Sequence, residues 1–124
     1  MGRITYMRTD STRISDEMIK QVRPYISETY GEDYLPAKPN VFSKSKEAQD
    51  AHEAIRPTSL SFPPSALTGI LSRDQLRLYT LIWNRFIASQ MAPQIQQSTS
   101  ATLQCGIYTL KATGVHVLFD GFTI

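Results

Sequence analysis

The chain has 124 residues, of which 41% are hydrophobic and 19% charged, and its formal net charge is +2. These values are typical of one soluble globular domain, or of one domain and part of another. No block of lysine and arginine stands out, which excludes a histone-like surface. The single cysteine excludes an internal disulfide and a cysteine-cluster metal site. No apolar run reaches the ~18 residues of a membrane span, so we expect a cytoplasmic protein without a membrane partner.

The first predicted helix follows a short apolar–polar stretch at residues 4–12. Ser15 is a suitable N-cap, and the two acidic residues after it favour the positive end of the helix dipole. Apolar residues then continue at helical spacing as far as Gly31, where we expect the helix to stop. Pro24 lies inside this pattern and is expected to bend the helix or split it.

The middle of the chain is predicted to be mostly irregular. Prolines and polar residues predict a loop over residues 32–46. A short helix is expected from about Lys46 to His52, and Pro57 would end it. One or two helical turns are expected at residues 65–71.

The clearest predicted helix begins after Ser72, which can form a capping box with Gln75. We expect Pro93 to close this segment. Its broad apolar face includes an aromatic stripe that could stack on bases, but the spacing favours packing in a core. The residues of this face are Leu76, Tyr79, Ile82, Trp83, Phe86 and Ile87.

After Pro93 the hydrophobic period changes from 3.6 to 2, which predicts an antiparallel β meander. Gly106 and Gly114 are expected to mark its turns, and Cys105 is expected to be buried and inert. A meander of about three strands is only weakly stable alone, and we therefore expect these strands to belong to a larger sheet. The predicted strands cover residues 98–105, 108–113 and 115–119.

The N-terminal stretch holds the first candidate for chemistry. A tyrosine hydroxyl such as that of Tyr6 can attack a phosphodiester, but a free phenol has a pKa of about 10 and needs a nearby cation or proton acceptor. Arg8, two residues later, offers a planar fork to the oxygens of the attacked phosphate. Thr9, Ser11 and Thr12 add hydroxyl groups that could hold neighbouring phosphates.

A second candidate cluster lies at residues 50–57, with the sequence Asp-Ala-His-Glu-Ala-Ile-Arg-Pro. His52 is the usual type of proton carrier near neutral pH, and Arg56 could bind another phosphate. His52 and Glu53 are adjacent and would leave a helix about 100° apart, so they are poor joint metal ligands. No metal site is therefore predicted.

Both clusters also have a purely structural interpretation. The first can be a half-buried tyrosine beside a helix cap, with Arg8 paired to Asp10. The second can be a structural histidine within a helix. Spacing alone favours these interpretations over catalysis.

Taken together and in order, the two clusters resemble the signatures of type IA DNA topoisomerases. Residues 4–12 resemble the active-site tyrosine motif of that family, and residues 48–58 resemble its second signature downstream. A methionine directly after the tyrosine, here Met7, resembles the pattern of the bacterial topoisomerase I branch. Arg3 is a small departure, since an apolar residue is common there. The resemblance extends more loosely over the whole chain.

The resemblance implies a role for each matching residue. Tyr6 resembles the nucleophile that cleaves one DNA strand and holds its 5′ phosphate as a phosphotyrosine, so that resealing needs no ATP. Arg8 resembles the residue that positions this tyrosine and the scissile phosphate. His52 resembles a phosphate-contacting residue linked to proton transfer. DNA-binding roles are carried over to Thr9, Ser11, Thr12 and Arg56, and supporting roles to Asp10 and Glu53.

The resemblance also implies a fold, a metal and partners. Residues 3–92 would be the mostly helical tyrosine domain, and residues 93–124 a truncated part of a hinge-like β domain. Mg²⁺ would be held by a separate Toprim domain of the full enzyme, and none by this chain. The full enzyme would bind single-stranded or underwound DNA in the bacterial nucleoid and relax negative supercoils by strand passage. The remaining domains of that enzyme are the expected protein partners.

A different class of function stays open alongside the enzyme. The chain can be a non-catalytic module that binds single-stranded DNA or another protein, and such a module would tolerate phenylalanine in place of Tyr6. A tyrosine recombinase or type IB topoisomerase is disfavoured, because those families place several arginine and histidine residues well before a late tyrosine.

Overall fold

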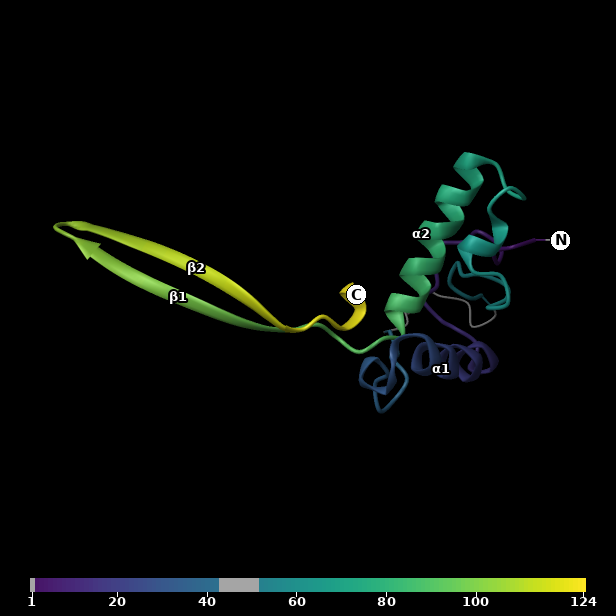
Figure 1. The fold of residues 1–124 in the computed structure, drawn as a ribbon, viewed down its shortest axis with the longest axis horizontal. Helices are drawn as coiled ribbons and strands as arrows, with labels where there is room; N and C mark the ends of the chain where they lie inside the picture. Colours follow the sequence, from purple (N-terminus) through teal and green to yellow (C-terminus); the bar gives the residue numbers. More distant parts are fainter. Residues whose placement is uncertain (1, 43–51) are drawn as a thin grey trace. The chain divides into compact units, whose positions relative to one another are not determined.

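The structure, a computed structural model, describes residues 2–42 and 52–124. The chain divides into two compact units, Met1–Met91 and Ala92–Ile124. The first unit contains both α-helices, and the second contains two strands (Figure 1). The predicted mixture of helices and an antiparallel β segment is therefore confirmed. Whether the two units correspond to domains of a longer enzyme stays a prediction.

Helix α1 spans Asp16–Tyr30 and begins as the sequence predicts. The hydroxyl of Ser15 accepts a hydrogen bond from the backbone N–H of Met18 at 3.3 Å. The helix ends at Gly31, whose φ of 108° lies in the region that favours glycine. Local capping chemistry thus sets both ends of this helix.

Pro24 does not split α1, which continues through it without a break. Pro24 is exposed, so its ring faces solvent and does not disturb the buried side. That side presents Val22 and Ile26, both fully buried. Burial of this apolar stripe offsets the single backbone hydrogen bond that proline cannot donate.

Helix α2 spans Arg73–Ser89 and carries the predicted capping box in full. The Ser72 hydroxyl accepts from the Gln75 backbone N–H at 3.3 Å, and the Gln75 side chain accepts from the Ser72 N–H at 3.1 Å. The aromatic stripe packs in the core, as its spacing predicts. The buried residues of α2 are Tyr79, Trp83, Phe86 and Ile87.

The core of the first unit joins the apolar stripes of α1 and α2. Trp83 is part of this core, with the Tyr25 ring edge-on at a centroid distance of 5.7 Å. The Tyr79 hydroxyl donates to the carbonyl of Phe62 at 2.6 Å. Burial raises the pKa of Tyr79, with Arg3 opposing the shift, and a protonated phenol is what this hydrogen bond requires.

Among the described residues between the helices, the named elements are two short 3₁₀ turns. Element η1 spans Glu32–Tyr34 within the predicted loop, and η2 spans Pro64–Leu67 near the predicted turns. Most of the helix expected from Lys46 to His52 lies outside the described residues. His52 itself is not helical.

The second unit is a two-stranded antiparallel ribbon, β1 (Ile95–Cys105) and β2 (Tyr108–Phe119) (Figure 1). Gly106 has a φ of 61° in the turn between them, as expected. The predicted third strand is wrong. Gly114 pairs with Thr99 inside the ladder, because extended backbone accepts glycine without a turn.

Cys105 is exposed, so the expectation of a buried thiol is also wrong. All residues of β1 are exposed, as are all of β2 except its last. A two-stranded ribbon has no second layer of its own to cover either face, so alternating apolar residues along it do not imply burial. Among the described residues, no helix combines the length and apolarity needed to cross a membrane.

Replacing Ile26 with alanine should lower the free energy of unfolding by about 2–5 kcal/mol, because the side chain is fully buried between the two helices. Urea unfolding of the 124-residue chain, monitored by the circular-dichroism signal of its helices, measures this loss. Ile70 is 68% exposed and supplies the matched control, with an expected change within about 0.5 kcal/mol for Ile70→Ala. Equal losses for the two variants would contradict the assigned core.

Candidate active site

Residues 52–58, called here the anchor segment, pair with the chain just before the Tyr6 loop, residues 6–10. The backbone N–H of Thr5 donates to the carbonyl of Arg56 at 2.9 Å. The Thr5 hydroxyl donates to the carbonyl of Ala54 and accepts from the N–H of Arg56, both at 3.0 Å. One threonine thus fixes the entry to the loop through its main chain and its side chain.

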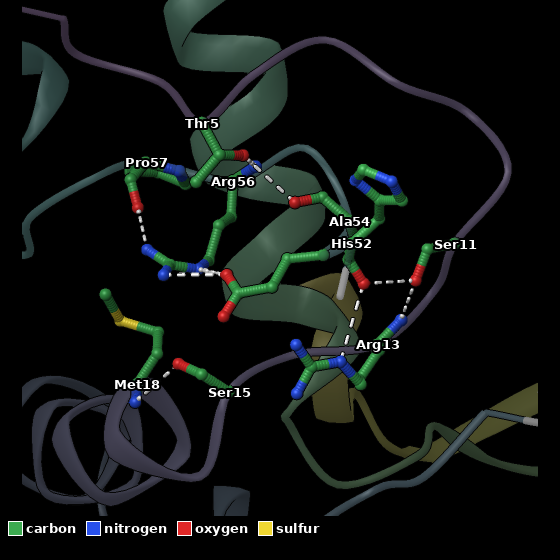
Figure 2. A network of polar contacts seen from close by, with 10 residues as sticks. Thr5, Ser11, Arg13, Ser15, Met18, His52, Ala54, Arg56 and Pro57 are labelled. Carbon is green, nitrogen blue, oxygen red and sulfur yellow. Dashed lines mark hydrogen bonds and ion pairs between the residues drawn. The ribbon is translucent and has the colours of Figure 1, made fainter. Parts of the chain in front are cut away.

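The anchor segment also binds the chain just after the Tyr6 loop. The Ser11 hydroxyl donates to the carbonyl of His52 at 2.9 Å, and the N–H of Ala54 donates to the carbonyl of Arg13 at 2.8 Å. Figure 2 shows the His52 carbonyl facing Ser11 and Arg13, with the imidazole ring directed away from them. Both ends of the Tyr6 loop are therefore tied to one short segment.

Arg8 connects the two candidate clusters directly. One of its terminal nitrogens, Nη1, lies 2.9 Å from Nε2 of His52, 44 residues away in sequence. Arginine only donates, so Nε2 must accept, which places the proton of a neutral imidazole on Nδ1. Arg8 Nε donates to the Asp10 carboxylate at 2.8 Å. The structure thus brings Arg8, Asp10 and His52 together.

Tyr6 is 82% exposed, and within the described residues its hydroxyl has no hydrogen-bond partner. The interpretation of a half-buried tyrosine is therefore wrong, although the Arg8–Asp10 pairing that accompanied it is confirmed. Met7 beside it is 75% exposed. An exposed phenol at this position is accessible to a large substrate.

Arg56 is held inside the chain. Its Nε and Nη2 both lie 2.8 Å from Oε2 of Glu53, and its Nη1 donates to the carbonyl of Pro57 at 2.9 Å. The two charged side chains are only 13% and 20% exposed. This arrangement favours a structural role for Arg56, and its predicted contact with DNA stays a prediction.

The predicted hydroxyl donors differ in what they offer to a ligand. Thr9 and Thr12 are exposed. Ser11 already donates its only hydroxyl proton to His52, so it helps to hold the anchor segment. The DNA-binding roles of all three residues stay predictions.

The acidic residues near the site do not form a cation site. The described residues contain no cluster of three or more histidine, cysteine or acidic side chains placed for a metal. The Asp10 and Glu53 carboxylates are each bound to an arginine. These residues do not fit a magnesium ion, and its placement in a separate domain stays a prediction.

Two residues of this network carry no strong signal in the sequence. Thr5 looks like an ordinary strand residue, and Arg13 like a surface cation before a helix cap. Their importance comes from partners about 40–50 positions away, with separations of 49 and 39 residues. Their only sequence clue is their position: Thr5 lies within the tyrosine motif of residues 4–12, and Arg13 follows it directly.

Replacing Glu53 with glutamine should lower the free energy of unfolding by roughly 1–3 kcal/mol, because a mostly buried Arg56 loses its counter-charge. Urea unfolding of the chain measures the loss, and hydrogen exchange at the N–H of Thr5 reports any loosening of the loop entry. Glu28, an exposed acid near the end of α1, provides the control Glu28→Gln, with a change within about 0.5 kcal/mol. An unchanged Glu53→Gln variant would contradict the proposed scaffold role.

Comparison with known proteins places the chain in a family. The sequence model of a family described as DNA topoisomerase matches residues 1–124. DNA topoisomerase 1 of Helicobacter pylori (strain 26695) is 51% identical over 123 residues, covering 98% of this chain and 17% of the relative. DNA topoisomerase 1 of Campylobacter jejuni is 49% identical over 123 residues, covering 98% and 18%. The chain therefore spans less than a fifth of the length of these curated relatives.

A solved structure agrees with these relatives. Full-length topoisomerase I from Thermotoga maritima matches with a TM-score of 0.83 and 41% sequence identity. The match covers 98% of this chain and 19% of the Thermotoga chain. The chain belongs to the DNA topoisomerase family and corresponds to a segment of bacterial type IA topoisomerase I.

Proposed function

We propose that this chain supplies the cleavage tyrosine of an enzyme that cuts and reseals one DNA strand. The observation that carries the proposal is the contact between His52 and Arg8, which lies on the same loop as the exposed Tyr6. It joins the two motifs at a loop whose ends are both anchored. Membership of the DNA topoisomerase family supports DNA as the substrate.

Tyr6 is the proposed nucleophile. Its phenolic oxygen attacks a DNA phosphorus, and the bond from that phosphorus to the 3′ oxygen breaks. The phenol gives up its proton, and the departing 3′ oxygen gains one. The products are a 5′-phosphotyrosine and a free 3′ hydroxyl, so the number of phosphoester bonds is unchanged. Resealing reverses these steps and needs no ATP.

Arg8 is proposed to stabilise the charge that grows on the attacked phosphate. A guanidinium matches two phosphate oxygens, and preorganised donors of this type lower the barrier most when they need not move. The hydrogen bond to His52 holds Arg8 in place, which supports such preorganisation. His52 is proposed to contact the same phosphate and assist proton transfer once DNA is bound. Thr9 and Thr12 would then hold neighbouring phosphates.

The alternative, a module that only binds single-stranded DNA or a protein, has one observation in its favour. Within the described residues, neither a base nor a cation touches the Tyr6 hydroxyl. Such a chain would bind without reacting. The two proposals differ in whether the hydroxyl of Tyr6 matters.

Tyr6→Phe should abolish covalent capture of DNA by a full-length topoisomerase that carries this chain as its matching segment. Cleavage of a 3′-end-labelled single-stranded oligonucleotide in the presence of Mg²⁺, followed by a denaturing quench, should leave the label on the protein. A 5′ label should remain on a released fragment. Tyr108→Phe, a change at an exposed tyrosine of β2, should leave the adduct intact. Binding without an adduct from the unaltered protein would favour the alternative module.

The 124-residue chain alone should not relax supercoiled DNA. It spans less than a fifth of its relatives, and the described residues contain no group of three or more histidine, cysteine or acidic side chains placed for a metal. A gel assay of negatively supercoiled plasmid with Mg²⁺ measures this, with a full-length topoisomerase carrying the chain as the positive control. Relaxation by the isolated chain, lost on Tyr6→Phe, would show that the segment is sufficient.

A further inference from the structure

An internal carboxylate already occupies one donor of the Arg8 guanidinium. Arg8 Nε donates to Oδ2 of Asp10 at 2.8 Å, and Arg8 Nη1 donates to His52 at 2.9 Å. The Arg8 and Asp10 side chains are 41% and 39% exposed. A phosphate can therefore approach the pair, but the Asp10 carboxylate already holds a negative charge at the Nε donor.

A carboxylate and a phosphate compete for the same guanidinium donors, because both present charged oxygens with matching geometry. An ion pair that is partly open to solvent contributes little to stability, so a DNA phosphate can displace it. The contact with His52 differs, since it is made by another nitrogen and joins separate parts of the chain. Displacement of Asp10 would thus leave Arg8 still attached to His52.

Asp10 is not needed to shape the loop. The loop ends are fixed by Thr5 and Ser11 through hydrogen bonds to the anchor segment, and none of these bonds involves Asp10. Instead, the Asp10 carboxylate binds Arg8, which lies two residues earlier on the same loop. Loss of this carboxylate would release Arg8 Nε without releasing the loop.

We propose that Asp10 is an internal competitor for the phosphate site of Arg8, holding the Nε donor in the DNA-free state until a DNA phosphate replaces it. The inference rests on the proposed function, in which Arg8 contacts a DNA phosphate. It assigns to Asp10 a role in setting DNA affinity rather than in supporting the fold.

The test measures binding of a fluorescent single-stranded oligonucleotide by anisotropy, at several salt concentrations. The protein is a full-length topoisomerase carrying this chain, with Tyr6→Phe in every sample to prevent cleavage. Asp10→Asn should tighten binding roughly two- to fivefold and steepen the salt dependence, because one more cation is available to DNA. Asp33→Asn, which removes an exposed acid in η1, is the charge-matched control and should change little.

Arg8→Ala, alone and with Asp10→Asn, separates the remaining outcomes. If Asp10 competes for Arg8, the gain from Asp10→Asn should vanish when Arg8 is absent. A gain that persists without Arg8 would mean general charge repulsion, and it would overturn the inference. So would weaker or unchanged binding by Asp10→Asn while Arg8→Ala still weakens binding. Unchanged binding by Arg8→Ala would overturn the proposed phosphate contact itself, and the inference with it.

Discussion

The site depends on one constraint: residues 3–5 and 11–13, on either side of the Tyr6 loop, are both hydrogen-bonded to the anchor segment. Two irregular segments satisfy each other's backbone groups, so neither needs to be a helix or a strand. The Tyr6 loop lies between the paired stretches and is restricted at both ends. Because α1 begins shortly after the second pairing, its position and that of the loop are set together.

Features of the fold that depend on local chemistry could be predicted from the sequence. Ser15, Ser72 and Gly31 end or begin helices through contacts within a few residues, and the apolar stripes follow helical spacing. Predictions that depend on what pairs with a segment or covers it are the ones that the structure contradicts. Gly114 fits an extended strand as well as a turn, and Cys105 is exposed because its ribbon has a single layer.

The candidate site was predictable as a set of residues but not as a set of contacts. The two motifs indicate Tyr6, Arg8 and His52 as candidates, and the structure joins the last two. The motifs did not indicate that Arg56 would turn inward to Glu53, or that Ser11 would donate to a carbonyl. Those partners are decided by the path of the backbone, which sequence spacing does not specify.

The place of Trp83 gives the chain a built-in optical reporter. It is the only tryptophan in the sequence and lies buried among the aromatic residues of the helical unit. Its emission therefore senses the packing of Tyr25 and Tyr79 around it. The second unit, Ala92–Ile124, contains no tryptophan and so contributes no tryptophan fluorescence. Tryptophan fluorescence therefore reports unfolding of the helical unit separately from changes in the second unit, and it needs no added label.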